Sequence, residues 1–193
     1  MTENEICTPG EALYKLIEGN KAYVEGVASP ADLSHDRMVE TAREGQAPYA
    51  LVVTCSDSRV PPEHIFSAGI GDLFVVRTAG NVIGDFERGS IEYAVEQLGV
   101  TLVVVMGHSQ CGAVGAALAG RASGYLDALV SEIAGGIAGA ADEYEALCRN
   151  VAHSQQRIRQ SATVSSLVEE GRLKIVGAHY DLQTGQVSFL PEG

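Results

Sequence analysis

The chain has 193 residues, 46% of them apolar, and its 13 basic and 25 acidic side chains give a net charge of −12. This length fits one domain, or at most two small ones, and the apolar fraction excludes wholesale disorder. The negative charge argues against nucleic acid or an anionic lipid surface as a partner, because phosphate binding requires basic side chains.

Four cysteines are too few for a disulfide scaffold in a chain of this length. The first residues are polar and acidic, without the basic start and apolar run of a signal peptide. The apolar runs have the length of strands and fall short of a membrane span. We therefore expect a cytoplasmic protein with no membrane partner, whose cysteines are structural, metal-binding or reactive rather than cross-linked.

Two helices are predicted at the start of the chain. Apolar positions in residues 11–23 form a helical stripe. Ser29 followed by Pro30 is typical of a helix N-cap and first turn, which predicts a second helix that ends at Gly45.

Apolar runs that alternate with helical segments follow. Strands are expected at residues 49–54, 72–77, 101–106, 173–178 and 187–190, and helices at 87–98, 111–119 and through most of 123–170, with a break at Gly135 and Gly136. Such alternation is typical of a parallel sheet covered on both faces. We predict an α/β fold with a mainly parallel central sheet of four strands, a short antiparallel edge strand and flanking helices. One domain would cover residues 1–193, with a helical arm (1–45) and an α/β core (46–193).

Two of the predicted strands are followed by residues that can hold a metal. Cys55 ends the first strand, and His108 and Cys111 follow the third. Ligands gather at the carboxyl ends of parallel strands, so these three side chains converge if the two strands are neighbours. Two thiolates and an imidazole suit Zn²⁺, with a fourth position left for water or for Asp57.

A less specific interpretation exists for each of these residues. A buried cysteine at a strand end is usually a small apolar side chain, and we expect this of Cys7 and Cys148. Asp57 and Arg59 could form a bidentate pair beside the metal, or only a surface ion pair of little value. No dinucleotide fingerprint or P-loop is present, and the turn from Gly107 to Cys111 lacks the final glycine of a nucleophile elbow.

The sequence resembles the β-class carbonic anhydrases. The resemblance is carried by CSDSRV at residues 55–60, DLFVVRTAGN at 72–81, GSIEYA at 89–94, GHSQCG at 107–112 and IVGAHYD at 175–181. It implies one Zn²⁺ per chain, held by Cys55, His108 and Cys111, and reversible hydration of carbon dioxide to bicarbonate and a proton through zinc-bound hydroxide. It also implies a homodimer or homotetramer in which the N-terminal helices extend onto a partner subunit.

The resemblance further implies catalytic roles for Asp57 and Arg59. Asp57 would pair with Arg59 and accept a hydrogen bond from the zinc-bound hydroxide, which aims the oxygen at carbon dioxide. In some members the matching aspartate is instead a fourth zinc ligand, and this closed state is inactive.

Four further residues match substrate-binding positions of the family. Gln46 matches a glutamine of the open members, and Gly112 matches a backbone contact to substrate. Phe74 and Tyr93 match pocket residues that a partner subunit often contributes, although their residue types alone indicate only core packing.

The resemblance leaves three points open. The helix after Tyr93 lacks the histidine that shuttles protons in plant-like members, so Glu96, another histidine or buffer would carry the proton. A hydrolase of carbonyl sulfide or carbon disulfide would have the same fold and metal. A zinc-bound regulatory homologue without turnover is the third possibility, which the intact Asp57 and Arg59 argue against.

Overall fold

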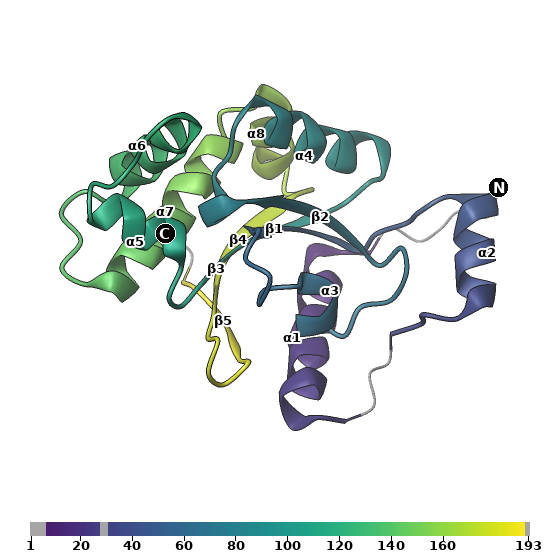
Figure 1. Cartoon of the computed structure of the whole chain (residues 1–193). Helices are drawn as coiled ribbons and strands as arrows, with labels where there is room; N and C mark the ends of the chain where they lie inside the picture. Colours follow the sequence, from purple (N-terminus) through teal and green to yellow (C-terminus); the bar gives the residue numbers. More distant parts are fainter. Residues whose placement is uncertain (1–6, 28–30, 192–193) are drawn as a thin grey trace.

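A five-stranded sheet forms the centre of the protein (Figure 1), in a computed structural model that describes residues 7–27 and 31–191. The strand order is β2-β1-β3-β4-β5. The first four strands pair in parallel, and the last pairs antiparallel with β4. The strands are β1 (Ala50–Cys55), β2 (Leu73–Thr78), β3 (Leu102–His108), β4 (Lys174–Tyr180) and β5 (Val187–Phe189). The predicted fold class is therefore confirmed.

Strands β1 and β3 are adjacent and buried along their whole length. Their continuous Val and Leu runs suit this position, because helices cover both faces of a parallel sheet. Thr54 is a buried polar residue of β1, and its hydroxyl donates to the carbonyl of Met106 at 2.9 Å. The neighbouring ends of β1 and β3 carry Cys55 and His108.

Helices pack on both faces of the sheet (Figure 1). One face is covered by α4 (Asp85–Gln97), α7 (Glu143–Ile158) and α8 (Ala162–Glu169), and the other by α1 (Pro9–Glu25) and α3 (Pro62–Ile65). Helices α5 (Gly112–Leu118) and α6 (Tyr125–Ile137) pack with α7 around a third apolar cluster, which includes both Cys55 and Cys111. The 3-10 turn η1 (Ala79–Asn81) and helix α2 (His35–Glu44) complete the fold. No helix in the two described ranges has the length and apolar character needed to cross a bilayer.

Helix α1 is anchored to the sheet by one of its faces. Thr8 and Glu11 form a capping box at its start, and Ala12 and Leu16 are fully buried in the cluster beneath the sheet. Its other face exposes Tyr14, Ile17 and Val24. Extension of this helix onto a partner subunit stays a prediction, as does the division into arm and core.

Two predicted helix boundaries were wrong. Helix α2 begins at His35, where the Ser34 hydroxyl accepts the Arg37 backbone N–H, and residues 31–34 are not helical. The proposed start at Ser29 and Pro30 falls on positions 28–30, which lie outside the described residues. Helix α6 continues through Gly135 and Gly136 to Ile137. Gly136 allows close packing against α7, because a Cβ there would lie 2.6 Å from the His153 side chain, whereas a Cβ on Gly135 would meet nothing within 4 Å.

Candidate metal centre

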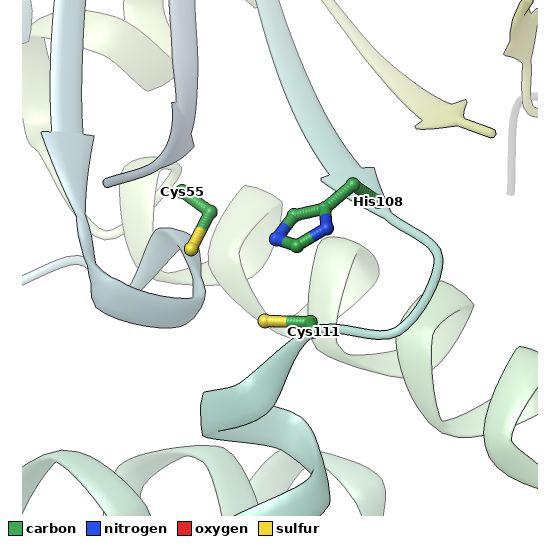
Figure 2. Close-up of side chains that lie close together, drawn as sticks. All are labelled: Cys55, His108 and Cys111. Carbon is green, nitrogen blue, oxygen red and sulfur yellow. The ribbon is translucent and has the colours of Figure 1, made fainter. Parts of the chain in front are cut away.

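Three donor side chains meet at the carboxyl edge of the sheet. Cys55 is the last residue of β1, His108 is the last residue of β3, and Cys111 is the N-cap of α5. All three are buried, and their donor atoms lie within 4.8 Å of one another. Figure 2 shows both sulfurs and the imidazole facing a common space. The predicted convergence therefore follows from the pairing of β1 with β3.

The imidazole of His108 is oriented as a metal ligand. Its Nδ1 lies 2.9 Å from the carbonyl oxygen of Ser109, which fixes the proton on Nδ1 because a carbonyl can only accept. Its Nε2 is buried and has no hydrogen-bond partner. A buried nitrogen without a partner is costly, and a metal ion would satisfy its lone pair.

The two cysteines differ in their surroundings. The Cys111 thiol and the backbone N–H groups of Gly80 and Asp57 donate toward Cys55 and, against an opposing effect of burial, lower the pKa of its thiol to about 4. The pKa of Cys111 is raised, because the Cys55 thiolate accepts its proton and because it is buried. The two sulfurs thus share one proton. Binding of a divalent cation would displace this proton, because cysteine coordinates a metal as the thiolate.

This donor set fits zinc. Zinc–sulfur bonds are about 2.3 Å and zinc–nitrogen bonds about 2.1 Å, so the donors around one ion lie roughly 4 Å apart. Two sulfurs and one nitrogen within 4.8 Å match this requirement. Three protein ligands leave a fourth position for water or substrate, as in catalytic rather than structural zinc sites.

Asp57 borders the donor group and is paired with Arg59. Its Oδ1 accepts the Arg59 Nε–H at 2.9 Å, and its Oδ2 accepts an Nη2–H at 2.7 Å. These bonds hold the pKa of the Asp57 carboxyl well below its usual range, against an opposing effect of burial. Asp57 Oδ2 lies 4.0 Å from His108 Nε2. The carboxylate is therefore engaged by Arg59 in this arrangement, and its alternative role as a fourth metal ligand stays a prediction.

Sequence reasoning missed Arg77 on β2. Its Nε–H donates to the Cys55 carbonyl at 3.0 Å, and its Nη2–H donates to the Asp57 carbonyl at 2.7 Å. It therefore ties β2 to the end of β1 and to the loop that follows it. A guanidinium at the end of an otherwise apolar strand was the available signal, because such a charge is retained near buried backbone only when it is paired.

Comparison with known proteins identifies the family. A family model described as carbonic anhydrase matches residues 50–187. Carbonic anhydrase 2 of Mycobacterium tuberculosis strain H37Rv is 41% identical over 192 residues, covering 92% of this chain and 91% of the relative. The β-carbonic anhydrase CafA of Aspergillus fumigatus is 30% identical with a TM-score of 0.72, covering 95% of this chain and 92% of the other. The chain belongs to the β-class carbonic anhydrases.

Further similar proteins agree with this assignment. The carbonic anhydrase of Mycolicibacterium smegmatis is 39% identical over 193 residues, which cover 94% of this chain and 93% of the relative. A tetrameric β-carbonic anhydrase of Sordaria macrospora has a TM-score of 0.70 and 30% identity, covering 82% of this chain and 88% of the other. The cofactor of this β-class carbonic anhydrase is zinc, for which Cys55, His108 and Cys111 supply the donors.

The four predicted substrate-binding residues lie at different distances from this centre. Gly112 directly follows Cys111 and is exposed at the first turn of α5. Gln46 is exposed in the loop between α2 and β1. Phe74 and Tyr93 contact each other, with ring centroids 6.1 Å apart.

The sheet register separates Phe74 from the centre of its own chain. Phe74 pairs with Leu51, whereas Cys55 pairs with Thr78, four residues further along β2. At ~3.3 Å per residue, this offset is about 13 Å. The structure of one chain therefore does not bring Phe74 and Tyr93 to its own metal centre, and their predicted roles stay predictions.

Proposed function

We propose that this β-class carbonic anhydrase catalyses the reversible hydration of carbon dioxide to bicarbonate and a proton. One observation carries the proposal: the buried donors Cys55, His108 and Cys111 lie beside a carboxylate that Arg59 holds in place. Three metal ligands with an adjoining ionised hydrogen-bond acceptor suit the activation of water.

The residues divide the chemistry between them. Zinc, when bound, lowers the pKa of a water molecule and so supplies a hydroxide nucleophile near neutral pH. Asp57 is ionised and can therefore only accept hydrogen bonds. Next to the metal donors, its carboxylate would accept a hydrogen bond from the attacking oxygen and so turn a lone pair of that oxygen toward the substrate carbon. Arg59 fixes the direction of this acceptor through two side-chain bonds.

Arg59 also provides a positive charge in a chain whose net charge would repel the anionic product. The product is an anion, and the chain has a net charge of −12. The Arg59 side chain is 52% exposed while it binds Asp57. Its guanidinium therefore keeps an exposed part next to the carboxylate that borders the metal donors, and we propose that this positive charge attracts bicarbonate against the overall field.

We also propose a homodimer or homotetramer in which Phe74 and Tyr93 line the pocket of a partner subunit. Two observations support this proposal: an offset of about 13 Å along the sheet separates Phe74 from Cys55 of its own chain, and Tyr93 is 48% exposed on α4. The Sordaria macrospora relatives are tetrameric. A cytoplasmic location belongs to the same proposal, because all four cysteines are free thiols.

Stopped-flow measurement of proton release from carbon dioxide, with zinc quantified in the same sample, tests the activity. We expect turnover that scales with zinc content up to one ion per chain. The same preparation is given carbonyl sulfide and carbon disulfide, with hydrogen sulfide as the readout. Turnover of the sulfur substrates alone, or one zinc per chain without hydration between about pH 7 and 9, would contradict the proposal.

A further inference from the structure

A network of buried polar side chains joins α7 to η1, the turn next to Cys55. The side chains of Asn81, Asn150 and Ser154 are each 1–2% exposed. Asn150 and Ser154 lie four residues apart on α7 and so share one helix face, which is turned toward η1. Buried polar groups are retained only with partners, and these groups find theirs in the turn that follows β2.

Four hydrogen bonds connect Asn150 and Ser154 of α7 with Gly80 and Asn81 of the turn. Asn150 donates through Nδ2 to the Gly80 carbonyl at 2.8 Å, and the same amide lies 3.4 Å from Asn81 Oδ1. Ser154 Oγ donates to the Asn81 carbonyl at 2.8 Å and accepts the Asn81 Nδ2–H at 3.1 Å. The backbone carbonyls of Gly80 and Asn81 are therefore both held by α7.

This turn presents a donor to a metal ligand. The Gly80 N–H points at Cys55 Sγ at 3.2 Å. Gly80 has a φ of 65° and Asn81 a φ of 49°, so two consecutive residues occupy the left-handed region. Glycine adopts this region freely, whereas at Asn81 it costs energy and persists because surrounding contacts hold it. Asn150 and Ser154 supply these contacts, and the result is an amide directed at a sulfur.

Close packing brings α7 to this position. A Cβ on Gly107 would lie 2.8 Å from Val151 Cγ2, and one on Gly177 would lie 3.0 Å from Val151 Cγ1. Glycines on β3 and β4 therefore let α7 approach the sheet immediately before His108. The helix, the turn and the ligand strands form one packed unit.

We propose that Asn150 is a positioning residue for the metal centre. It acts through the Gly80 N–H, and so sets both the zinc affinity of the site and the character of the bond between zinc and the Cys55 sulfur. The inference rests on the proposed function insofar as it takes zinc as the resident ion. Partners that orient metal ligands contribute roughly 10- to 100-fold to metal affinity. Hydrogen bonds to a coordinating sulfur also withdraw electron density from it, which alters the metal–sulfur bond.

The test uses the full-length protein and the variant Asn150→Ala, with Asn20→Ala as a matched control. Asn20 is a buried asparagine whose amide bridges the carbonyls of Ile65 and Gly185, so its loss removes similar bonds far from the metal donors. Zinc affinity is measured by competition with a chromophoric chelator. Cobalt is substituted for zinc to record the thiolate-to-cobalt charge-transfer band.

We expect Asn150→Ala to bind zinc roughly 10- to 100-fold more weakly and to shift the charge-transfer band to longer wavelength, while Asn20→Ala keeps both properties. Ser154→Ala, which removes two of the contacts to Asn81, should give the same changes to a smaller extent and carries the test if Asn150→Ala does not fold. Unchanged affinity and an unchanged band in the folded variants would overturn the proposal, as would equal losses in Asn20→Ala. Neither readout needs carbon dioxide, so failure of this inference is distinct from failure of the proposed activity.

Discussion

Asp57 receives three hydrogen bonds from Arg59: one from the backbone N–H at 2.9 Å and two from the guanidinium at 2.9 and 2.7 Å. A forked contact of this kind fixes the plane of the carboxylate as well as its position. Arg77 holds the Asp57 carbonyl at the same time. The acceptor beside the metal donors is therefore fixed by contacts from both of its neighbouring arginines before substrate arrives.

Replacement of Asp57 by asparagine should separate metal binding from turnover. Asp57→Asn keeps the side-chain shape, and Cys55, His108 and Cys111 remain, so we expect one zinc per chain. The amide lacks the charge that binds Arg59 and presents a donor where an acceptor is needed. Loss of an oriented acceptor should lower kcat for hydration about 10²-fold or more, measured by stopped flow.

Asp85→Asn is the matched control for this variant. Asp85 also forms an ion pair with an arginine, Arg88, but at an exposed position on α4. Such surface pairs contribute little, so activity should stay within twofold of the wild type. Equal turnover in Asp57→Asn and Asp85→Asn would remove Asp57 from the mechanism.

The pH dependence of turnover should not report on Asp57. Arg59 lowers the pKa of this carboxyl below its ordinary value near 4, so Asp57 is ionised at every pH above about 5. Removal of the guanidinium in Arg59→Ala raises this pKa only toward its ordinary value. We therefore expect the kcat/KM profile between about pH 6 and 9 to keep the same inflection in Arg59→Ala, with a lower plateau. An inflection displaced by more than one pH unit would show that the pair itself titrates in this range.

The metal ligands should be separable from the remaining cysteines. Cys55→Ser and His108→Ala each remove one of three donors, so we expect less than about a tenth of a zinc per chain and no measurable hydration. Cys148→Ser serves as the control, because Cys148 is a half-buried thiol of α7 that is not part of the donor group. Zinc content by elemental analysis distinguishes the outcomes, and full zinc loading of Cys55→Ser would contradict the assigned ligand set.

The sequence predicted the parts of the site that depend on strand order and missed those that depend on packing. Cys55 and His108 each end a continuous apolar run, so the pairing of two parallel strands was enough to bring them together. Gly80 lies in a backbone turn and Asn150 on a helix 70 residues later in the chain. No local sequence pattern connects the two residues. The start of α2 was predicted wrongly because two serines nearby could each cap a helix. Ser29 followed by Pro30 has the residue types of a helix start, and nothing in the local sequence favours Ser34, which is the N-cap in the structure. Tyr93 lies half exposed on α4, so its predicted role in the pocket of a partner subunit stays a prediction.

Two glycines of α1 give a final prediction about how this helix is held. A Cβ on Gly19 would lie 1.9 Å from the Phe66 carbonyl oxygen, whereas one on Gly10 would meet nothing within 4 Å. Neither residue has a positive φ, so alanine suits the backbone at both positions. Gly10→Ala should leave the free energy of unfolding unchanged or raise it by up to about 1 kcal/mol. Gly19→Ala gains the same helix preference but pushes α1 away from a fixed backbone atom, which should cost about 1–3 kcal/mol or more. Urea unfolding of both variants measures the difference, and a Gly19→Ala protein as stable as Gly10→Ala would show that α1 is not seated on α3 in this way.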